Sequence, residues 1–335
     1  MTTTVKPKLV LVHGIGGPRD IEDERREWRR ALAEGARAAG RADAISGLTM
    51  DWTVDTAFAC YADLFARAGA QGAAEDDLDE ESAEVTLAVA ADVVEALLAS
   101  PEHADNALLL RLRSQARPEP LDETGRRKQH EGVGVLARRA SAVCAKLARV
   151  PGVQIGLRRA SAAQCLGALS QPGRYLRRKE ATRLADGRTA SLDERARERV
   201  LAELDPARPT IVIAHSLGTV VAWEALAGYE GPVPLFLTLG SPLAMNALIW
   251  QRLRPRPPAV PATVRRWVDF WDGDDPVVPL RRLADLVAPN AAGVRPEPVP
   301  LASRLLWTHP ATVYLRRPEV AQVVLDAVAE HPTAS

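Results

Sequence analysis

Residues 210–226 have the sequence TIVIAHSLGTVVAWEAL, and this stretch decides the fold. Its first five residues form an apolar run rich in β-branched side chains, which is typical of a buried strand. Residues 219–226 follow a helical pattern. Between them lies Ser216, with the small residues Ala214 and Gly218 two positions before and after it. This spacing predicts a tight turn in which strand and helix approach closely while the serine stands clear of the sheet. The alternative is an ordinary strand-to-helix turn with a capping serine.

Further apolar runs along the chain predict the other strands of a sheet. They lie at residues 9–13, 53–61, 234–239 and 264–271, with a helix as the alternative for residues 53–61. Residues 20–40 and 318–330 have helical spacing, and Pro318 suits a first helical turn. Because strands and helices alternate in this way, we expect an α/β fold with a mostly parallel central sheet.

The segment 72–205 interrupts this alternation and has few strand signals. Residues 136–150 and 192–204 have helical patterns, and apolar residues repeat every four positions at Val85, Val89, Val93 and Leu97. We expect a single domain over residues 1–335 with segment 72–205 as a large helical insertion. Because α/β sheets place their sites at the carboxyl ends of the strands, the insertion is expected to cap the pocket there.

The composition bounds the classes of function. The 335 residues are 47% hydrophobic, enough to bury a large core, and their charges balance to a formal net charge of zero. No global field therefore draws the chain toward nucleic acid. The three cysteines are widely spaced and indicate neither a disulfide framework nor a zinc site: Cys60, Cys144 and Cys165. These cysteines fit a reducing cytoplasm, so a cytoplasmic protein is expected. No apolar stretch is expected to span a membrane.

The motif HGIG, which begins at His13, follows the first predicted strand. Acyl transfer needs N–H donors aimed at the oxygen that becomes negative. The backbone N–H groups of Ile15 and Leu217 are the candidates for this oxyanion hole. Gly14 and Gly16 let the backbone approach a ligand closely, and His13 is expected to support the loop rather than to act as a base. A plain glycine turn is the alternative.

A serine hydroxyl needs a base to take its proton and an acid to orient that base. Asp275 is the favoured acid, with Asp272 as its main rival, in the stretch VDFWDGDDPVVP after a late strand. Two histidines follow this stretch. His331 lies in a polar tail, whereas His309 lies in a loop before the last helix and is the favoured base. The order serine, acid, histidine is the order expected for a serine on a strand-to-helix turn.

These motifs resemble the α/β-hydrolase superfamily, in its lipase- and esterase-like branch. The segments that carry the resemblance are LVLVHGIGG, TIVIAHSLGTVVAWEAL, LFLTLGSPL, VDFWDGDDPVVP and THPATVYL, within roughly 1–65 and 205–335. The resemblance implies an α/β-hydrolase fold with Ser216 as nucleophile, Asp275 as acid and His309 as base. It also implies that the GSPL loop borders the pocket.

The expected activity is hydrolysis of carboxylic esters, lipid-like ones included, through an acyl-serine intermediate. No metal or cofactor is expected, because the chain contains neither a GxxxxGK phosphate loop nor an HExxH motif. A peptidase or amidase with the same triad is the first alternative, and a binding or signalling module with an idle triad is the second. Basic residues of the insertion could contact an anionic head group or membrane surface, although a solvated face is favoured: Arg126, Arg127, Lys128, Arg138 and Arg139.

Overall fold

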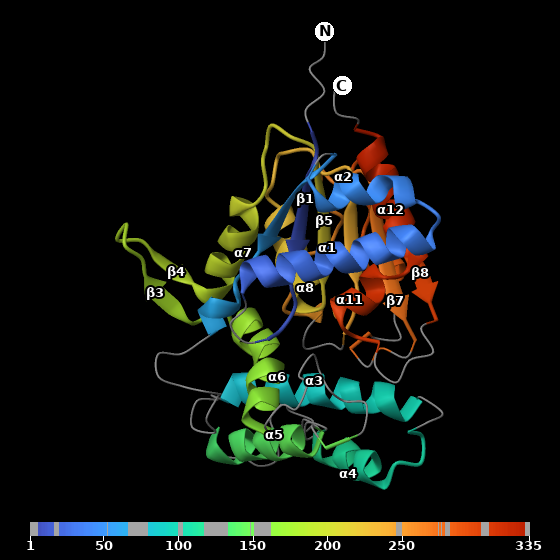
Figure 1. Ribbon diagram of the computed structural model, residues 1–335. Helices are drawn as coiled ribbons and strands as arrows, with labels where there is room; N and C mark the ends of the chain where they lie inside the picture. The colour runs from blue at the N-terminus through green and yellow to red at the C-terminus, as the bar shows by residue number, and fades with distance from the viewer. Residues whose placement is uncertain are drawn as a thin grey trace.

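The protein is an α/β structure in which helices cover a parallel sheet (Figure 1). It is a computed structural model. The described residues are 6–16, 20–51, 53–65, 80–99, 103–116, 133–147, 149–150, 162–245, 250–273, 275, 277–278, 282–302 and 308–331. The basic residues at 126–128 lie outside them. Residues 75–84 form an acidic run that the sequence favours as a solvated loop; residues 75–79 also lie outside, whereas residues 80–84 begin helix α3.

The central sheet has six strands in the order β2-β1-β5-β6-β7-β8, and each neighbouring pair is parallel. The expected mostly parallel sheet is therefore confirmed. Because the strands are parallel, their carboxyl ends lie at the same side of the sheet, where β1 and β5 continue into the loops that follow them. The strands are β1 Lys8–Val12, β2 Asp55–Ala59, β5 Thr210–His215, β6 Phe236–Leu239, β7 Trp267–Asp272 and β8 Pro296–Leu301.

Two helical layers cover the sheet. In Figure 1, α1, α2, α11 and α12 lie over the near face, while α7 and α8 pack together on the other side. The helices of these layers are α1 Ile21–Ala38, α2 Ile45–Thr49, α7 Leu192–Ala202, α8 Leu217–Leu226, α11 Ala311–Leu315 and α12 Pro318–Ala329. Three short helices complete the body: η1 Ala42–Ala44, η2 Ala62–Phe65 and α10 Leu283–Leu286.

Alternate residues of the central strands enter two separate hydrophobic cores, because successive side chains of a strand point to opposite faces. In β5, Ile211 and Ile213 pack with α1 and α12, whereas Val212 and Ala214 pack toward α8. Both faces of the sheet are thus buried. This explains why the central strands are continuous apolar runs rather than alternating ones.

Strand β8 was not expected from the sequence, because Pro296, Pro298 and Pro300 occupy every second position. Proline has no N–H to give to a sheet, so prolines indicate a loop or an edge. β8 lies at the edge beyond β7, and only one side of an edge strand is paired. The alternation leaves the intervening residues with N–H groups, which is compatible with pairing along one side.

The cap helices are α3 Glu80–Ala99, α4 Ala107–Ala116, α5 Val133–Leu147 and α6 Ala162–Arg177. They pack on one another and form a separate layer below the sheet in Figure 1. The remaining part of the insertion differs from the expectation of helices alone. A hairpin of β3 Ala181–Arg183 and β4 Thr189–Ser191 projects from the body, and α7 packs mainly on α8 of the body, with a smaller contact to the cap helix α6.

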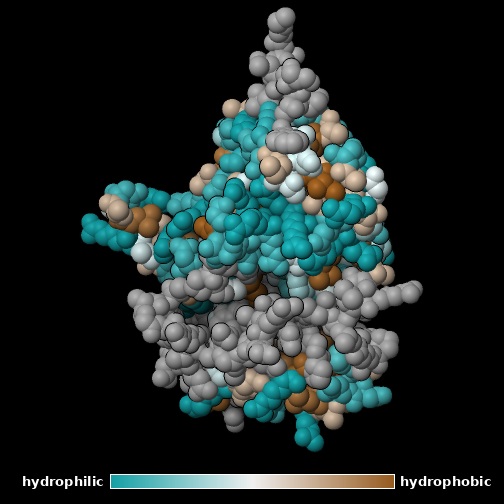
Figure 2. All heavy atoms as spheres, in the orientation of Figure 1, coloured by the Kyte–Doolittle hydropathy of each residue, from teal (hydrophilic) through white to brown (hydrophobic). Residues whose placement is uncertain are grey.

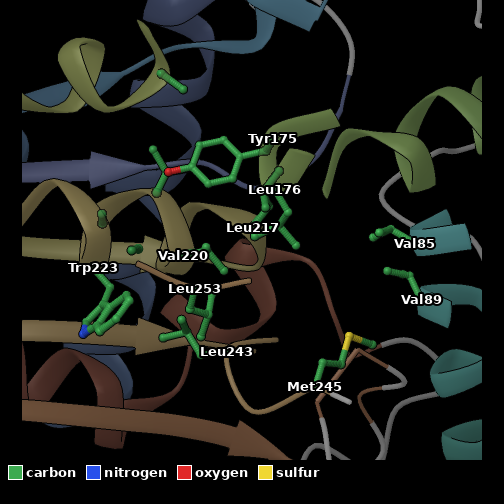
Figure 3. Packing of buried hydrophobic residues seen from close by; sticks show 14 of the residues in the cluster. Val85, Val89, Tyr175, Leu176, Leu217, Val220, Trp223, Leu243, Met245 and Leu253 are labelled. Atoms are coloured by element: carbon green, nitrogen blue, oxygen red, sulfur yellow. The ribbon is translucent and has the colours of Figure 1, made fainter. Parts of the chain in front are cut away.

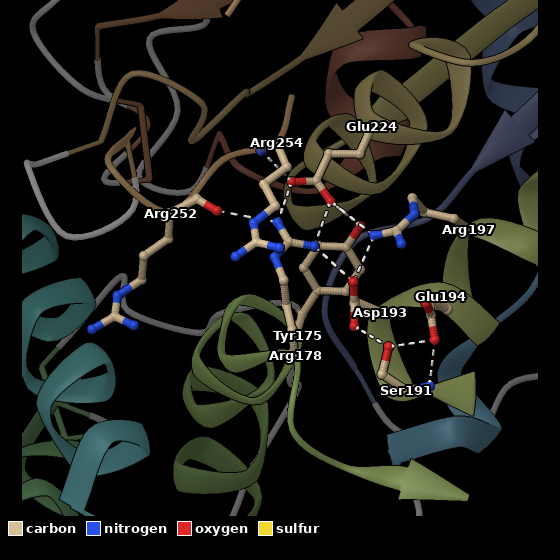
Figure 4. Close-up of polar contacts among 9 residues, drawn as sticks. All are labelled: Tyr175, Arg178, Ser191, Asp193, Glu194, Arg197, Glu224, Arg252 and Arg254. Carbon is tan, nitrogen blue, oxygen red and sulfur yellow. Dashed lines mark hydrogen bonds and ion pairs between the residues drawn. The ribbon is translucent and has the colours of Figure 1, made fainter. Parts of the chain in front are cut away.

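A buried charge cluster connects α6 with the body (Figure 4). Arg178, which follows α6, donates to the Glu224 carboxylate of α8 at 2.6 Å and to Asp193 of α7 at 2.7 Å. Arg197 donates to the same two carboxylates, and Tyr175 of α6 donates its hydroxyl to Glu224 at 2.7 Å. The side chains of Glu224 and Asp193 are 1% and 3% exposed, so these cations offset the cost of burying the two carboxylates.

The described surface seen in Figure 2 is mostly hydrophilic over the body. None of the described helices combines the length and the apolar character needed to cross a membrane.

Replacing Arg178 tests the buried charge cluster. The change Arg178→Leu leaves Glu224 and Asp193 buried with one cation fewer, so we expect the free energy of unfolding to fall by roughly 3 kcal/mol in urea titrations. The matched control is Arg188→Leu, which removes an exposed pair with Glu198 and should leave the midpoint nearly unchanged. Equal effects of the two substitutions would contradict the importance of burial at this cluster.

Candidate active site

Ser216 lies at the turn between β5 and α8, where it is 3% exposed. Its backbone has φ 54° and ψ −131°, a conformation that residues other than glycine rarely adopt. Gly218 allows this turn to form: a β-carbon there would collide with the carbonyl oxygens of His13 and Val12. The turn thus brings the start of α8 against the end of β1.

The loop after β1 lies directly on Ser216. A β-carbon at Gly14 would come within 2.6 Å of the Ser216 β-carbon and 3.2 Å of its Oγ. Only glycine permits this approach without a shift of the neighbouring atoms. The small residues expected at Gly14 and Gly218 are therefore both required by close contacts between the two loops.

His309 lies in the loop before α11, and its Nε2 is 3.0 Å from Ser216 Oγ. The His309 ring is buried. His215 donates its Nε2 hydrogen to the His309 carbonyl oxygen at 2.6 Å, and the two rings lie 4.7 Å apart. This contact holds the loop that carries His309 against the strand that carries Ser216.

Asp275 lies on the other side of the imidazole. Both of its carboxylate oxygens are 2.9 Å from His309 Nδ1. Because a carboxylate only accepts, Nδ1 carries the hydrogen, and in the neutral ring Nε2 faces Ser216 as an acceptor. Asp275 also accepts from the Tyr314 hydroxyl at 2.7 Å and from the Val277 N–H at 2.9 Å. Burial alone would raise the pKa of Asp275, but these hydrogen bonds and the adjacent His309 outweigh it and lower the pKa.

Gly240, at the end of β6, makes room for Asp275 and Tyr314. Its φ is +54°, and a β-carbon there would lie 2.7 Å from Asp275 Oδ2 and 3.3 Å from the Tyr314 ring. The next residue, Ser241, contacts the hydroxyl of Thr219 on α8 at 2.9 Å. The GSPL loop therefore lies beside the site, as the resemblance implied.

The other candidate acids occupy different places. The backbone carbonyl of Asp272 accepts from the Asp275 N–H at 3.1 Å, so Asp272 helps to shape the turn that presents Asp275. Asp269 lies in β7, where its carboxyl accepts from the Thr238 hydroxyl at 2.6 Å. Burial raises the pKa of Asp269 to about 7, and the Thr238 hydrogen bond only partly offsets this.

His13 holds the glycine loop. The Tyr61 N–H donates to His13 Nε2 at 3.1 Å, so the ring hydrogen is on Nδ1, which donates to the Gly14 carbonyl at 2.6 Å. The Tyr61 hydroxyl donates to the His13 carbonyl, and the two rings are stacked. Both nitrogens of His13 are engaged in supporting the loop, which agrees with the structural role expected of it.

A cavity of about 30 Å³ opens beside Ser216. In Figure 3, Leu217 and Val220 of α8 lie on one side and Val89 of α3 on the other, with Met245 nearby. Ser216 supplies the only polar side chain among the described residues that line it, the others being Ile15, Val89, Val93, Pro172, Leu176, Leu217, Val220, Pro242, Met245 and Val277. Two cap helices, α3 and α6, thus contribute to the wall.

Sequence reasoning missed several residues of the site. Tyr314 had a weak signal, since it lies in the same segment as His309. Gln171 had none, because its side chain contacts Gly16, 155 positions away. His215 lies next to Ser216 but was not singled out, since a histidine beside the serine has no fixed role.

No family model, curated protein or solved structure matches the chain. The described residues hold no group of three or more His, Cys, Asp or Glu side chains that could bind a metal ion. The site brings together a hydroxyl, an imidazole and a carboxylate in hydrogen-bonded series. Such a series can move a proton from Ser216 to His309 while Asp275 stabilises the charged ring.

The buried carboxyl of Asp269 predicts a pH-dependent stability. A carboxyl whose pKa rises on folding stabilises the fold fully below its ordinary value of 3.8, and this contribution is lost as the pH rises through about 7. Asp269→Asn keeps an acceptor for Thr238 and does not ionise. We expect the free energy of unfolding of the variant, relative to the original protein, to increase between pH 5 and pH 8. A difference that does not change with pH would contradict the raised pKa.

Proposed function

We propose that this protein is a serine hydrolase of the α/β-hydrolase type that cleaves carboxylic esters through an acyl-serine intermediate. The observation that carries the proposal is the series Ser216 Oγ, His309 and Asp275, joined by distances of 3.0 and 2.9 Å in a buried site. The strained turn at Ser216 supports it, because such a turn presents a nucleophile at the edge of a sheet.

The reaction would proceed in two halves. His309 Nε2 takes the proton of Ser216 Oγ as the oxygen attacks the ester carbonyl carbon, and the π electrons of the carbonyl move to its oxygen. The N–H groups of Ile15 and Leu217 are the proposed donors to this oxyanion. The C–O bond to the alcohol then breaks, and His309 gives its proton to the leaving oxygen. Water repeats the sequence on the acyl-serine and releases the acid.

The cavity favours a short, apolar acyl group. Apart from Ser216, the described residues that line it have apolar side chains, so among these residues no wall side chain offers a partner for a charged or strongly polar acyl chain. Its volume of about 30 Å³ leaves room for only a few carbon atoms in this conformation. Val89 and Val93 of the cap helix α3 line the cavity, and this contribution from the cap supports a substrate of small size over a long chain or a folded protein.

The first test is covalent labelling of Ser216. A fluorophosphonate should label the protein, and Ser216→Ala should abolish both labelling and ester hydrolysis without changing the unfolding midpoint. Losing the nucleophile of such a triad costs about 10⁶-fold in rate. Ser241→Ala is the matched control, because Ser241 is a second buried serine near the site. Ser241 itself should not react, so this variant should still be labelled at Ser216. Equal labelling of Ser216→Ala would refute the proposal.

The second test measures acyl-chain preference with p-nitrophenyl esters from acetate to octanoate and with the matching anilides. We expect the short esters to be preferred in the original protein. Val89→Ala removes two methyl groups from the cavity wall and should shift kcat/KM toward longer chains by about tenfold, since each buried CH2 contributes about 0.8 kcal/mol. Val135→Ala, on the exposed side of the cap helix α5, should not shift it. Preference for the anilides would favour an amidase instead.

A further inference from the structure

Gln171, in the cap helix α6, binds the glycine loop of the body through both ends of its amide. Its Oε1 accepts from the Gly16 N–H at 3.1 Å, and its Nε2 donates to the Gly16 carbonyl at 2.8 Å. The glutamine is 6% exposed. Gly16 has φ +150°, a conformation that favours glycine. A cap side chain therefore satisfies both backbone groups of a residue in the loop beside Ser216.

The peptide group between Gly14 and Ile15 lies between two fixed points. On one side, His13 Nδ1 donates to the Gly14 carbonyl at 2.6 Å. On the other side, Gln171 holds Gly16. Because a trans peptide is planar, its N–H points away from its carbonyl oxygen. Hydrogen bonds that fix the Gly14 carbonyl and the Gly16 backbone therefore fix the direction of the Ile15 N–H.

Helix α6 is well placed to act as a rigid support. One turn beyond Gln171, Tyr175 donates to Glu224, and Arg178 donates to Glu224 and Asp193 (Figure 4). Glu224 belongs to α8, the helix that begins directly after Ser216. The helix that holds the glycine loop is thus anchored to the helix that starts at the serine.

We infer that Gln171 is a positioning residue for the oxyanion hole, supplied by the cap to the loop that carries Ile15. The inference rests on the proposed function, since an oxyanion forms only if Ser216 attacks a carbonyl. It means that the cap does more than enclose the cavity: the loop has its reacting geometry only while α6 is docked. Gln171 is not among the described residues that line the cavity beside Ser216, so its contribution should appear in the transition state and not in substrate binding.

The experiment compares Gln171→Leu with the original protein on a short p-nitrophenyl ester. Loss of a direct oxyanion donor costs about 100- to 1000-fold in kcat, and a displaced donor should cost less. We expect kcat to fall about 10- to 100-fold while KM stays within about threefold. Affinity for an alkyl trifluoromethyl ketone should fall by a similar factor, because Ser216 Oγ adds to its carbonyl carbon, the serine proton passes to His309, and the carbonyl oxygen becomes an oxyanion.

Two further variants keep the test decisive. Gln171→Glu retains an acceptor for the Gly16 N–H but loses the donor to the Gly16 carbonyl, so it should also lower kcat. This variant serves as the test if Gln171→Leu does not fold. Gln115→Leu makes the same substitution at an exposed glutamine of the cap helix α4 and should leave kcat unchanged.

The outcomes separate this inference from the proposed function. An active original protein whose Gln171 variants keep kcat within about twofold, or bind the ketone as tightly as before, would overturn the inference and leave the hydrolase proposal standing. Parallel losses of kcat and of the unfolding midpoint, with ketone affinity unchanged, would assign Gln171 a purely structural role and also overturn it. An original protein that neither hydrolyses esters nor reacts with a fluorophosphonate would overturn both.

Discussion

The close contact between the loop after β1 and the turn after β5 is the constraint on which the rest of the site depends. Gly218 lies against the carbonyl oxygens of Val12 and His13, and Gly14 lies against the side chain of Ser216. A single methyl group at either glycine would separate the two loops. The backbone N–H groups proposed for the oxyanion hole come from these two loops, so their spacing follows from this contact. The parallel pairing of β1 with β5 brings the loops to the same edge of the sheet.

Much of the body could be predicted because its signals are local. The runs that became β1, β5, β6 and β7 are buried on both faces, and such strands are continuous and apolar in sequence. Edge strand β8 was not predicted, because its prolines are compatible with a strand only where one side of that strand is unpaired. The sequence does not show which strand lies at the edge of a sheet. The short hairpin β3–β4 escaped because three-residue strands are too short to show a period.

The candidate site was predicted in part for the same reason. Ser216 and the glycines have their meaning in the immediate sequence, and chain order favoured His309 as the base. The choice between Asp275 and Asp272 stayed open, because spacing alone does not tell which carboxyl a turn directs at an imidazole. In the structure, Asp275 faces His309 and the backbone of Asp272 supports the turn. Tyr314 and Gln171 act through contacts made only after folding, so no local pattern indicates them.

Helix α6 and the residue after it present polar and apolar contacts on different faces, and this arrangement has a physical reason. Leu176 and Pro172 line the cavity, where a charge would need a partner that the apolar side chains among the described lining residues do not offer. The polar contacts of Tyr175 and Arg178 are directed at Glu224, and neither residue is among the described residues that line the cavity. Buried ion pairs add little net stability over apolar packing, but they accept few alternative geometries. Apolar contacts alone would allow α6 several positions relative to α8, whereas the charge cluster defines one position of α6. Gln171, one turn before Tyr175, bonds Gly16 from the same stripe of the helix, so the charge cluster and the glycine loop contact one face of α6.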